Sequence, residues 1–296
     1  MQNSAQKLAL VTGGAGFIGS HLCERLVKEG YRVISLDNYF TGSEENHVPG
    51  VEYRADHTKK IDELVPERPD VIYHLGEYAR VAKSLEEPAL VWDLNMDGTF
   101  AVLEYWRKTK CKLIYSGSST KSVGPREDGV PGRDLAMYTW AKAAMCDLVN
   151  NYARWYELSY VIVYFYNVYG PRERSVADHG TLIETFRQKY LKGEPLTVRS
   201  PGTQRRAFTH VEDTVNGIMF ASEQGEGDGY GISSTDDLSL LEVAELFGGE
   251  VVMLPQTQST RERSVIDSTK ITALGWKQAK TLKEYVEEIK RSAPST

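Results

Sequence analysis

The sequence predicts an α/β protein built on a doubly wound parallel sheet, with a smaller, interleaved C-terminal lobe. In the first half of the chain, short β-rich runs alternate with longer helical patterns, as they do in βαβ units. The runs are almost continuously apolar, which is typical of strands buried on both faces of a parallel sheet. After Tyr166 the alternation weakens, and turns with Gly and Pro divide the chain into shorter pieces. We therefore expect one domain over residues 1–166 and a second lobe over residues 167–296.

Each element follows from a local pattern. Gly30 ends the first helical stretch at the C′ position that glycine favours. Residues 207–220 read as a strand and a helix that return to the sheet, whereas the glycine-rich stretch 225–231 is predicted to be a surface loop. Right-handed crossovers between the parallel strands give the doubly wound arrangement. The predicted strands are residues 7–12, 32–36, 51–55, 70–75, 111–116 and 160–166, and the predicted helices are residues 17–29, 99–108 and 138–157.

Composition excludes several classes of protein. The chain has 296 residues, 41% of them hydrophobic and 26% charged, which is ordinary for a globular protein with its own core. A net charge of −6 argues against a nucleic-acid or anionic-membrane partner. Three widely spaced cysteines, Cys23, Cys111 and Cys146, are expected to be buried and reduced, with neither a disulfide framework nor a metal site. We see no signal peptide and no apolar run near the ~20 residues that span a membrane, so we expect a cytoplasmic protein.

A glycine-rich turn follows the first predicted strand. Residues 11–19 read Val-Thr-Gly-Gly-Ala-Gly-Phe-Ile-Gly, which places Gly13, Gly16 and Gly19 at intervals of three where the first helix begins. Such glycines let a pyrophosphate approach the backbone, and the helix N-terminus offers free N–H groups. Asp37 ends the second strand, where a carboxylate can accept hydrogen bonds from an adenosine ribose. Because a carboxylate repels a 2′-phosphate and the next residues are not basic, the pattern predicts NAD rather than NADP.

A second motif, Tyr138-Thr-Trp-Ala-Lys142, opens a long helical stretch. Tyr138 and Lys142 are one turn apart and therefore lie on the same helix face. A nearby ammonium group lowers the pKa of a phenol by stabilising the phenolate, which lets a tyrosine act as a base. Downstream of a dinucleotide-binding turn, this spacing predicts a catalytic pair.

A third motif follows the strand predicted at residues 111–116. Residues 116–121 read Ser-Gly-Ser-Ser-Thr-Lys. Hydroxyl groups at the C-terminal end of a parallel strand face the crevice in which ligands bind. We expect Ser119 or Thr120 to bind a substrate oxygen and to share a proton with Tyr138.

These three motifs, in this order, resemble the extended short-chain dehydrogenase/reductase family, and within it the NAD-dependent nucleotide-sugar epimerases and dehydratases. The resemblance covers essentially the whole chain and implies a Rossmann fold, bound NAD and a nucleotide-diphosphate sugar as substrate. Further supporting stretches are Asp-Asn-Tyr-Phe-Thr-Gly at 37–42, His-Leu-Gly-Glu at 74–77, Asn-Met-Asp-Gly-Thr at 95–99, Tyr-Asn-Val-Tyr-Gly-Pro-Arg at 166–172, Gln-Arg-Arg-Ala-Phe at 204–208 and Leu-Gly-Trp at 274–276.

The resemblance also implies roles for residues at matching positions. Asp56 would contact the adenine, and basic or amide side chains would approach the diphosphate of the substrate. The implied NAD-binding residues are Gly13, Gly16, Phe17, Ile18, Gly19, Asp37, Asn38, Thr41, Gly42, Asp56, Leu75, Gly76, Tyr138 and Lys142. The implied substrate-binding residues are Asn95, Asn167, Arg206 and Arg261. Glu77 is a spare carboxylate that either reaches the substrate or lies behind the site or on the surface.

A homodimer is implied as well, through a four-helix interface to which each subunit contributes two helical stretches, residues 97–108 and 138–156. Large apolar side chains are frequent in both stretches. They are Phe100, Val102, Leu103, Trp106, Trp140, Met145, Leu148, Val149 and Trp155.

The chain departs from the family pattern in the Ser/Thr loop. Val123 stands where epimerases usually have a tyrosine, and Thr120-Lys121 stands where many 4,6-dehydratases have Asp-Glu. The loop thus lacks the usual carboxylic acid and carboxylate base, which leaves Lys121 as the candidate base. Together, residues 74–81, 116–121 and 164–169 are similar to 4,6-dehydratases of bacterial legionaminic-acid pathways, which act on a nucleotide-linked N-acetylglucosamine.

We therefore interpret the chain as an NAD-dependent nucleotide-sugar 4,6-dehydratase. Tyr138 would take the proton of the C4 hydroxyl, Lys142 would hold the cofactor ribose, and water would leave across C5–C6. The alternative is a 4-epimerase, which returns the hydride to the other face of C4. A non-catalytic NAD-binding regulator is disfavoured by the intact Tyr138/Lys142 pair, and related decarboxylase or reductase chemistry remains open.

Overall fold

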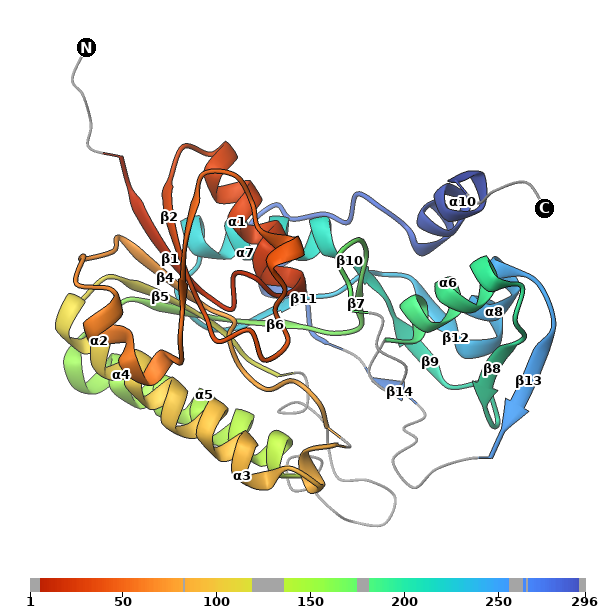
Figure 1. The fold of residues 1–296 in the computed structure, drawn as a ribbon, viewed down its shortest axis with the longest axis horizontal. Helices are drawn as coiled ribbons and strands as arrows, with labels where there is room; N and C mark the ends of the chain where they lie inside the picture. The colour runs from red at the N-terminus through yellow and green to blue at the C-terminus, as the bar shows by residue number, and fades with distance from the viewer. Residues whose placement is uncertain are drawn as a thin grey trace.

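A seven-stranded parallel sheet, in the order β11-β6-β5-β4-β1-β2-β3, organises the computed structural model. The structure describes residues 6–81, 83–118, 136–174, 181–255, 263–264 and 266–292. The predicted doubly wound α/β fold is confirmed, and strand order reverses on either side of β1 (Figure 1). The strands are β1 (Leu8–Thr12), β2 (Arg32–Asp37), β3 (Val51–Ala55), β4 (Val71–His74), β5 (Lys112–Ser116), β6 (Tyr160–Phe165) and β11 (Gly227–Ile232).

Helices cover both faces of this sheet. Leu22 and Leu26 of α1 pack with Ile218 of α7 in a core on one face. On the other face, Trp106 of α4 and Val149 of α5 belong to a second core (Figure 1). The helices on the first face are α1 (Phe17–Lys28), α7 (Val211–Gln224) and α9 (Thr269–Ala273). On and beside the second face lie α2 (Ile61–Leu64), α3 (Pro88–Val91), the π-helix η4 (Trp92–Asp97), α4 (Gly98–Thr109) and α5 (Met137–Tyr156).

The predicted boundaries in the first half of the chain agree with these elements. Each of the six predicted strands and three predicted helices matches an observed element to within one residue at either end. Short 3₁₀ turns, η1 (Glu44–Asn46), η2 (Thr58–Lys60) and η3 (Lys83–Leu85), occupy connecting segments. Agreement is close because continuous apolar runs mark the doubly covered strands directly.

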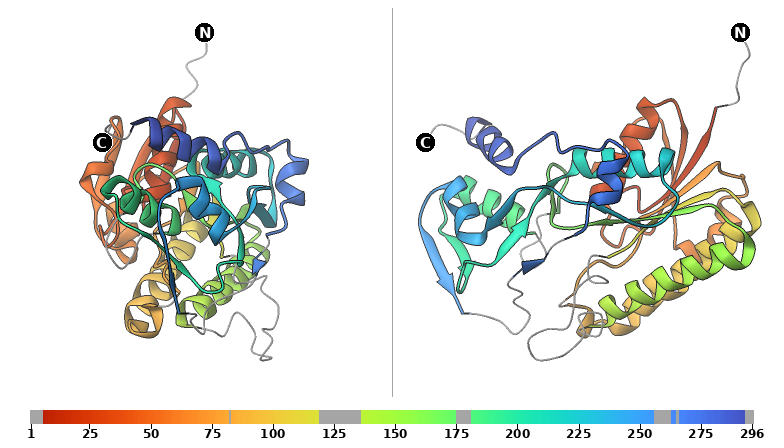
Figure 2. Two further views of the ribbon diagram at one scale, coloured as in Figure 1. Left: turned by 90° about the vertical axis from the view of Figure 1, so that its right-hand side faces the viewer. Right: turned by 180° about the vertical axis from the view of Figure 1, so that it is seen from behind.

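A second lobe stands at one end of the sheet (Figure 2). Its own apolar core joins Phe186 of α6, Phe247 of α8 and Val286 of α10. The strand pair β7–β10 lies between this core and the sheet (Figure 1). The elements after β6 that lie outside the large sheet are β7 (Val168–Tyr169), α6 (Leu182–Lys192), β8 (Leu196–Arg199), β9 (Arg205–Ala207), β10 (Thr209–His210), β12 (Asp237–Ser239), α8 (Leu240–Phe247), β13 (Val251–Leu254), β14 (Arg263–Ser264) and α10 (Leu282–Ser292).

The prediction of a surface loop at residues 225–231 is wrong. This stretch forms most of β11, the edge strand that pairs in parallel with β6. The pairing shifts register between Gly227 and Tyr230, and Gly227 and Gly229 have positive φ, so the glycines permit an irregular strand rather than a turn. The return predicted for residues 207–220 comes from α7, because β10 pairs with β7 instead of entering the large sheet.

No helix in the described part of the chain is long and apolar enough to cross a membrane. Cys23, Cys111 and Cys146 are buried, and none of the three forms a disulfide.

Candidate active site

A cleft of about 710 Å³ opens at the C-terminal ends of β1, β2, β4 and β5, where ligands bind in doubly wound folds. Every residue that was predicted to bind the cofactor, from Gly13 to Lys142, lines this cleft. Arg172, Glu173, Arg174 and Thr181, from the region after β7, complete its wall. The structure therefore joins the three sequence motifs around one space.

The glycine turn is shaped by close backbone contacts. Gly13 has φ +76°, and a Cβ on it would lie 2.8 Å from Cα of Gly76. A Cβ on Gly19 would lie 2.0 Å from the carbonyl oxygen of Gly13. No side chain caps the N-terminus of α1, which begins after Gly16. An uncapped helix end with close backbone approach fits a pyrophosphate.

Asp37 is held in place at the end of β2. Its carboxylate accepts hydrogen bonds from the N–H groups of Ala15 at 2.9 Å and Tyr39 at 2.8 Å, and the residue is 7% exposed. Burial raises the pKa of this carboxyl, while the two N–H groups lower it. Because a carboxylate has about four acceptor positions, it retains room for two ribose hydroxyls. These acceptor positions fit the ribose hydroxyls of NAD.

Tyr138 lies in the first turn of α5 and Lys142 lies one turn later, both on the cleft wall. Burial raises the pKa of the Tyr138 phenol, whereas the Lys142 charge and a hydrogen bond with Ser118 lower it. Among the described residues, the hydroxyl group that hydrogen-bonds to Tyr138 is that of Ser118. Ser119 and Thr120, rather than Ser118, were predicted for this role. Ser119, Thr120 and Lys121 lie outside the described residues.

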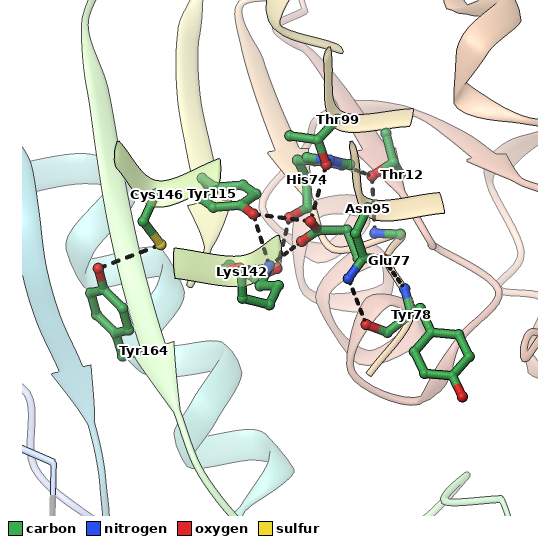
Figure 3. Close-up of polar contacts among 12 residues, drawn as sticks. Thr12, His74, Glu77, Tyr78, Asn95, Thr99, Tyr115, Lys142, Cys146 and Tyr164 are labelled. Atoms are coloured by element: carbon green, nitrogen blue, oxygen red, sulfur yellow. Dashed lines mark hydrogen bonds and ion pairs between the residues drawn. The ribbon is translucent and has the colours of Figure 1, made fainter. Parts of the chain in front are cut away.

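A network of polar contacts surrounds Lys142 (Figure 3). Its ammonium group contacts the carboxylate of Glu77, the hydroxyl of Tyr115 at 3.0 Å and the carbonyl oxygen of Ser116. Glu77 in turn accepts hydrogen bonds from Tyr115 at 2.9 Å and Thr99 at 3.0 Å. Tyr115 and Thr99 were not predicted, since they lie on a buried strand and helix with no sequence signal for a polar network.

Glu77 lines the cleft, but three other predicted substrate residues do not. Asn95 is buried and uses its amide on the backbone of Tyr78, with contacts of 2.6 and 3.0 Å. Asn167 has a positive φ of 46° and donates to the carbonyl oxygen of Ala207 at 3.1 Å. Arg206 on β9 donates to the carbonyl oxygen of Arg205 at 2.7 Å. The remaining candidate, Arg261, is outside the described residues.

Several ionisable residues on the cleft wall were missed. The pKa of Arg80 is lowered by burial and then by the charge of Arg174, so two guanidinium groups act on each other across the same cleft. Burial raises the pKa of Glu173 to about 7. Arg80 and Arg172 lie in the motif stretches 74–81 and 166–172, but neither was assigned a role from the sequence. Cationic groups here suit a diphosphate, which favours charge-assisted hydrogen bonds.

Comparison with known proteins agrees with this geometry. A model described as the NAD dependent epimerase/dehydratase family matches residues 9–233. A putative UDP-glucose 4-epimerase from Methanocaldococcus jannaschii is 30% identical over 298 residues, which cover 95% of this chain and 97% of the relative. A UDP-N-acetyl-alpha-D-glucosaminuronate decarboxylase from Bacillus cytotoxicus is 32% identical over 256 residues, 81% of this chain and 79% of the relative.

A solved structure has a similar fold. The crystal structure of a UDP-glucose 4-epimerase with UDP-glucose, from Thermotoga maritima, is 28% identical with a TM-score of 0.87. The match covers 96% of this chain and 98% of that protein.

Proposed function

Since this chain belongs to the NAD-dependent epimerase/dehydratase family, we propose that it is a nucleotide-sugar 4,6-dehydratase whose substrate carries N-acetylglucosamine. The observation that carries the proposal is the position of Tyr138 and Lys142 in the same cleft as the glycine turn and Asp37. It puts the Tyr138 phenol, whose pKa depends on Lys142, beside the proposed cofactor-binding residues. NAD is the cofactor of the family, and it supplies the acceptor and donor of hydride when bound.

The first half-reaction is an oxidation at C4 of the hexose. The Tyr138 phenolate takes the proton of the C4 hydroxyl, and bound NAD would accept the hydride from C4. Lys142 stabilises that phenolate through its charge, and Ser118 does so by hydrogen bonding. Asp37 and the N-terminus of α1 hold the cofactor at its ribose and pyrophosphate.

The second half-reaction removes water. The C4 ketone acidifies the C5 proton. A base takes that proton and gives it to the C6 hydroxyl, which leaves as water. Bound NADH would supply the hydride to C6, and a proton from solvent would then complete C5. We assign the base to Lys121 because the loop has Thr120-Lys121 where carboxylates usually stand. An amine must be partly neutral for this role, and burial or nearby positive charge lowers its pKa in that direction.

Epimerisation at C4 is the second candidate. It is favoured by the 28–30% identity, over nearly the whole chain, to proteins named as UDP-glucose 4-epimerases. It shares the first half-reaction, and it differs in returning the hydride to the other face of C4.

One experiment separates the two. The purified protein is incubated with a panel of nucleotide sugars, and products are followed by mass spectrometry and by deuterium exchange at C5. Loss of one water with C5 exchange supports the dehydratase. A C4 epimer of unchanged mass without C5 exchange establishes the epimerase instead.

The role of Lys121 has its own test. Loss of a positioned base costs about 10²–10⁴-fold in rate, so Lys121→Met should block C5 exchange. NAD binding and transient C4 oxidation, seen as NADH absorbance, should survive. Exchange at the parent rate in Lys121→Met would exclude Lys121 as the base.

We also propose that the protein is a homodimer, with the interface formed by α4 and α5. Apart from Leu148, which is partly buried against the core, the apolar side chains predicted for that interface divide into two groups. Val102, Leu103, Trp106, Met145 and Val149 are buried in the core of their own chain. Phe100, Trp140 and Trp155 are 50%, 40% and 55% exposed, and Trp140 stacks on the exposed Trp92 with ring centroids 6.3 Å apart. These exposed aromatic side chains support a partner on this face.

A further inference from the structure

A buried carboxylate is paired with Lys142 of the Tyr138/Lys142 pair. Glu77 follows β4 by three residues, and its side chain is 4% exposed, beside the 3% exposed side chain of Lys142. Two charges removed from water are costly unless each is paired and hydrogen-bonded. The stability of this buried pair therefore depends on the hydrogen-bond partners of both charged groups.

The donors of Lys142 are fully used. An ammonium group has three N–H bonds, and the structure gives three acceptors, the Glu77 carboxylate, the Tyr115 hydroxyl and the Ser116 carbonyl oxygen. The nitrogen also lies 4.3 Å from the centroid of the Tyr115 ring. Its position is thus fixed from several directions, and Glu77 supplies the opposite charge.

Glu77 is the end of an ordered chain of donors (Figure 3). The Thr99 hydroxyl gives its only hydrogen to Glu77, so it must accept from Nε2 of His74 at 3.0 Å. Nδ1 of His74 then accepts from the Thr12 hydroxyl at 2.6 Å. Burial lowers the pKa of His74 to about 4, which keeps the ring neutral and consistent with this direction. In this series of contacts each hydroxyl or ring N–H hydrogen is directed toward Glu77. The Glu77 carboxylate accepts hydrogen bonds and donates none.

We propose that Glu77 is a positioning residue that holds the Lys142 ammonium in place and offsets its charge beside Tyr138. The proposal rests on the catalytic role assigned to that pair above. In this role Glu77 acts through Lys142, because three of its roughly four acceptor positions are taken by Lys142, Thr99 and Tyr115.

The charges of Lys142 and Glu77 have opposite effects on the pKa of the Tyr138 phenol. Lys142 lowers the pKa of Tyr138 and Glu77 raises it. The other named contributors are burial and Cys146, which raise that pKa, and the Ser118 hydrogen bond, which lowers it. In Glu77→Gln the amide oxygen still accepts from Lys142, and Tyr115 and Ser116 still hold the ammonium group. Only the negative charge is lost, which leaves the effect of Lys142 unopposed, so the phenol should titrate at a lower pH.

The test measures the phenol directly. The full-length protein is labelled with ¹³Cζ-tyrosine, and the Tyr138 resonance is identified by its loss in Tyr138→Phe. In Glu77→Gln we expect the Tyr138 pKa to fall by about one unit, with and without NAD. The rising limb of the pH–activity profile should move to lower pH by the same amount. Glu77→Asp, which keeps the charge, and Thr99→Val, which removes only a donor to it, should leave the pKa near the parent value.

A second pair of variants covers a failure of Glu77→Gln to fold. Replacing both buried charges with apolar side chains is often tolerated, so Glu77→Met with Lys142→Met should return the Tyr138 pKa toward the parent value, whereas Lys142→Met alone raises it. An unchanged or raised pKa in Glu77→Gln overturns the proposal, as does a double variant that matches Lys142→Met. Because the titration needs no substrate, its outcome is independent of whether the enzyme proves to be a dehydratase.

Discussion

At the scale of single residues, we expect Asp37 to select NAD over NADP. Its carboxylate is fixed by the backbone of Ala15 and Tyr39, so it cannot turn away from a 2′-phosphate. Hydrogen bonds to a charged group contribute about 1.5–3 kcal/mol, or roughly 10–100-fold in affinity. Asp37→Ala should weaken NAD binding by that factor in calorimetric titration, and the parent protein should bind NADP more weakly than NAD.

The matched control for Asp37 is Asp62→Ala, which removes an exposed carboxylate paired with Lys108 away from the cleft. Its NAD affinity should equal that of the parent. Equal or tighter binding of NADP by the parent protein would contradict the assignment of Asp37.

Lys142 is expected to set the pH at which Tyr138 acts as the proposed base. A base acts in its deprotonated form, so the rate rises as pH passes the pKa of the phenol. The Lys142 charge lowers that pKa, and its loss in Lys142→Met must raise it. The rising limb of the rate profile should therefore move to higher pH. Ser118→Ala should move it in the same direction, because the Ser118 hydrogen bond also lowers the pKa. A limb that stays in place in Lys142→Met would show that the phenol is not the titrating base.

At the scale of elements, the junction of β1 and α1 depends on the absence of a side chain at Gly19. A Cβ there would lie 2.0 Å from the carbonyl oxygen of Gly13, and backbone must move to admit it. Overpacking costs typically 1–3 kcal/mol, so Gly19→Ala should lower the free energy of unfolding by at least that range and abolish NAD binding. Denaturant unfolding and titration measure the two effects.

Gly16→Ala serves as the neighbouring control. Gly16 has φ −80°, which any residue adopts, and a Cβ on it would lie 3.1 Å from the same oxygen. The loss of stability should be clearly smaller than in Gly19→Ala. Similar losses in both variants would mean that the turn tolerates side chains more evenly than the structure indicates.

At the scale of the whole molecule, the exposed aromatic side chains on α4 and α5 make dimerisation testable. Light scattering at micromolar concentration should give the mass of two chains. Phe100→Glu combined with Trp155→Glu should give the mass of one chain, because each change places a charge in a desolvated contact. Leu191→Glu, at a comparably exposed position on α6, should leave the dimer intact. A monomeric parent protein would end the proposal.

The sequence by itself determined the sheet, its flanking helices and the cofactor turn. These features depend on local information: apolar runs for strands, a 3.6-residue period for helices, and glycine spacing where backbone must approach a phosphate. Tyr138 and Lys142 were found for the same reason, since both stand on one turn of one helix. The prediction for residues 225–231 was wrong because glycines are typical of turns. The local sequence does not show that this stretch can pair with the edge of β6.

Only the tertiary structure decided which polar groups meet. Glu77 and Lys142 are 65 positions apart, yet they form a buried ion pair because β4 and β5 end side by side and α5 packs against them. Asn95 was expected to reach the substrate, but its amide supports the backbone of Tyr78. Such pairings follow from the order of strands in the sheet, and no local pattern in the sequence encodes the distance between side chains that the fold brings together.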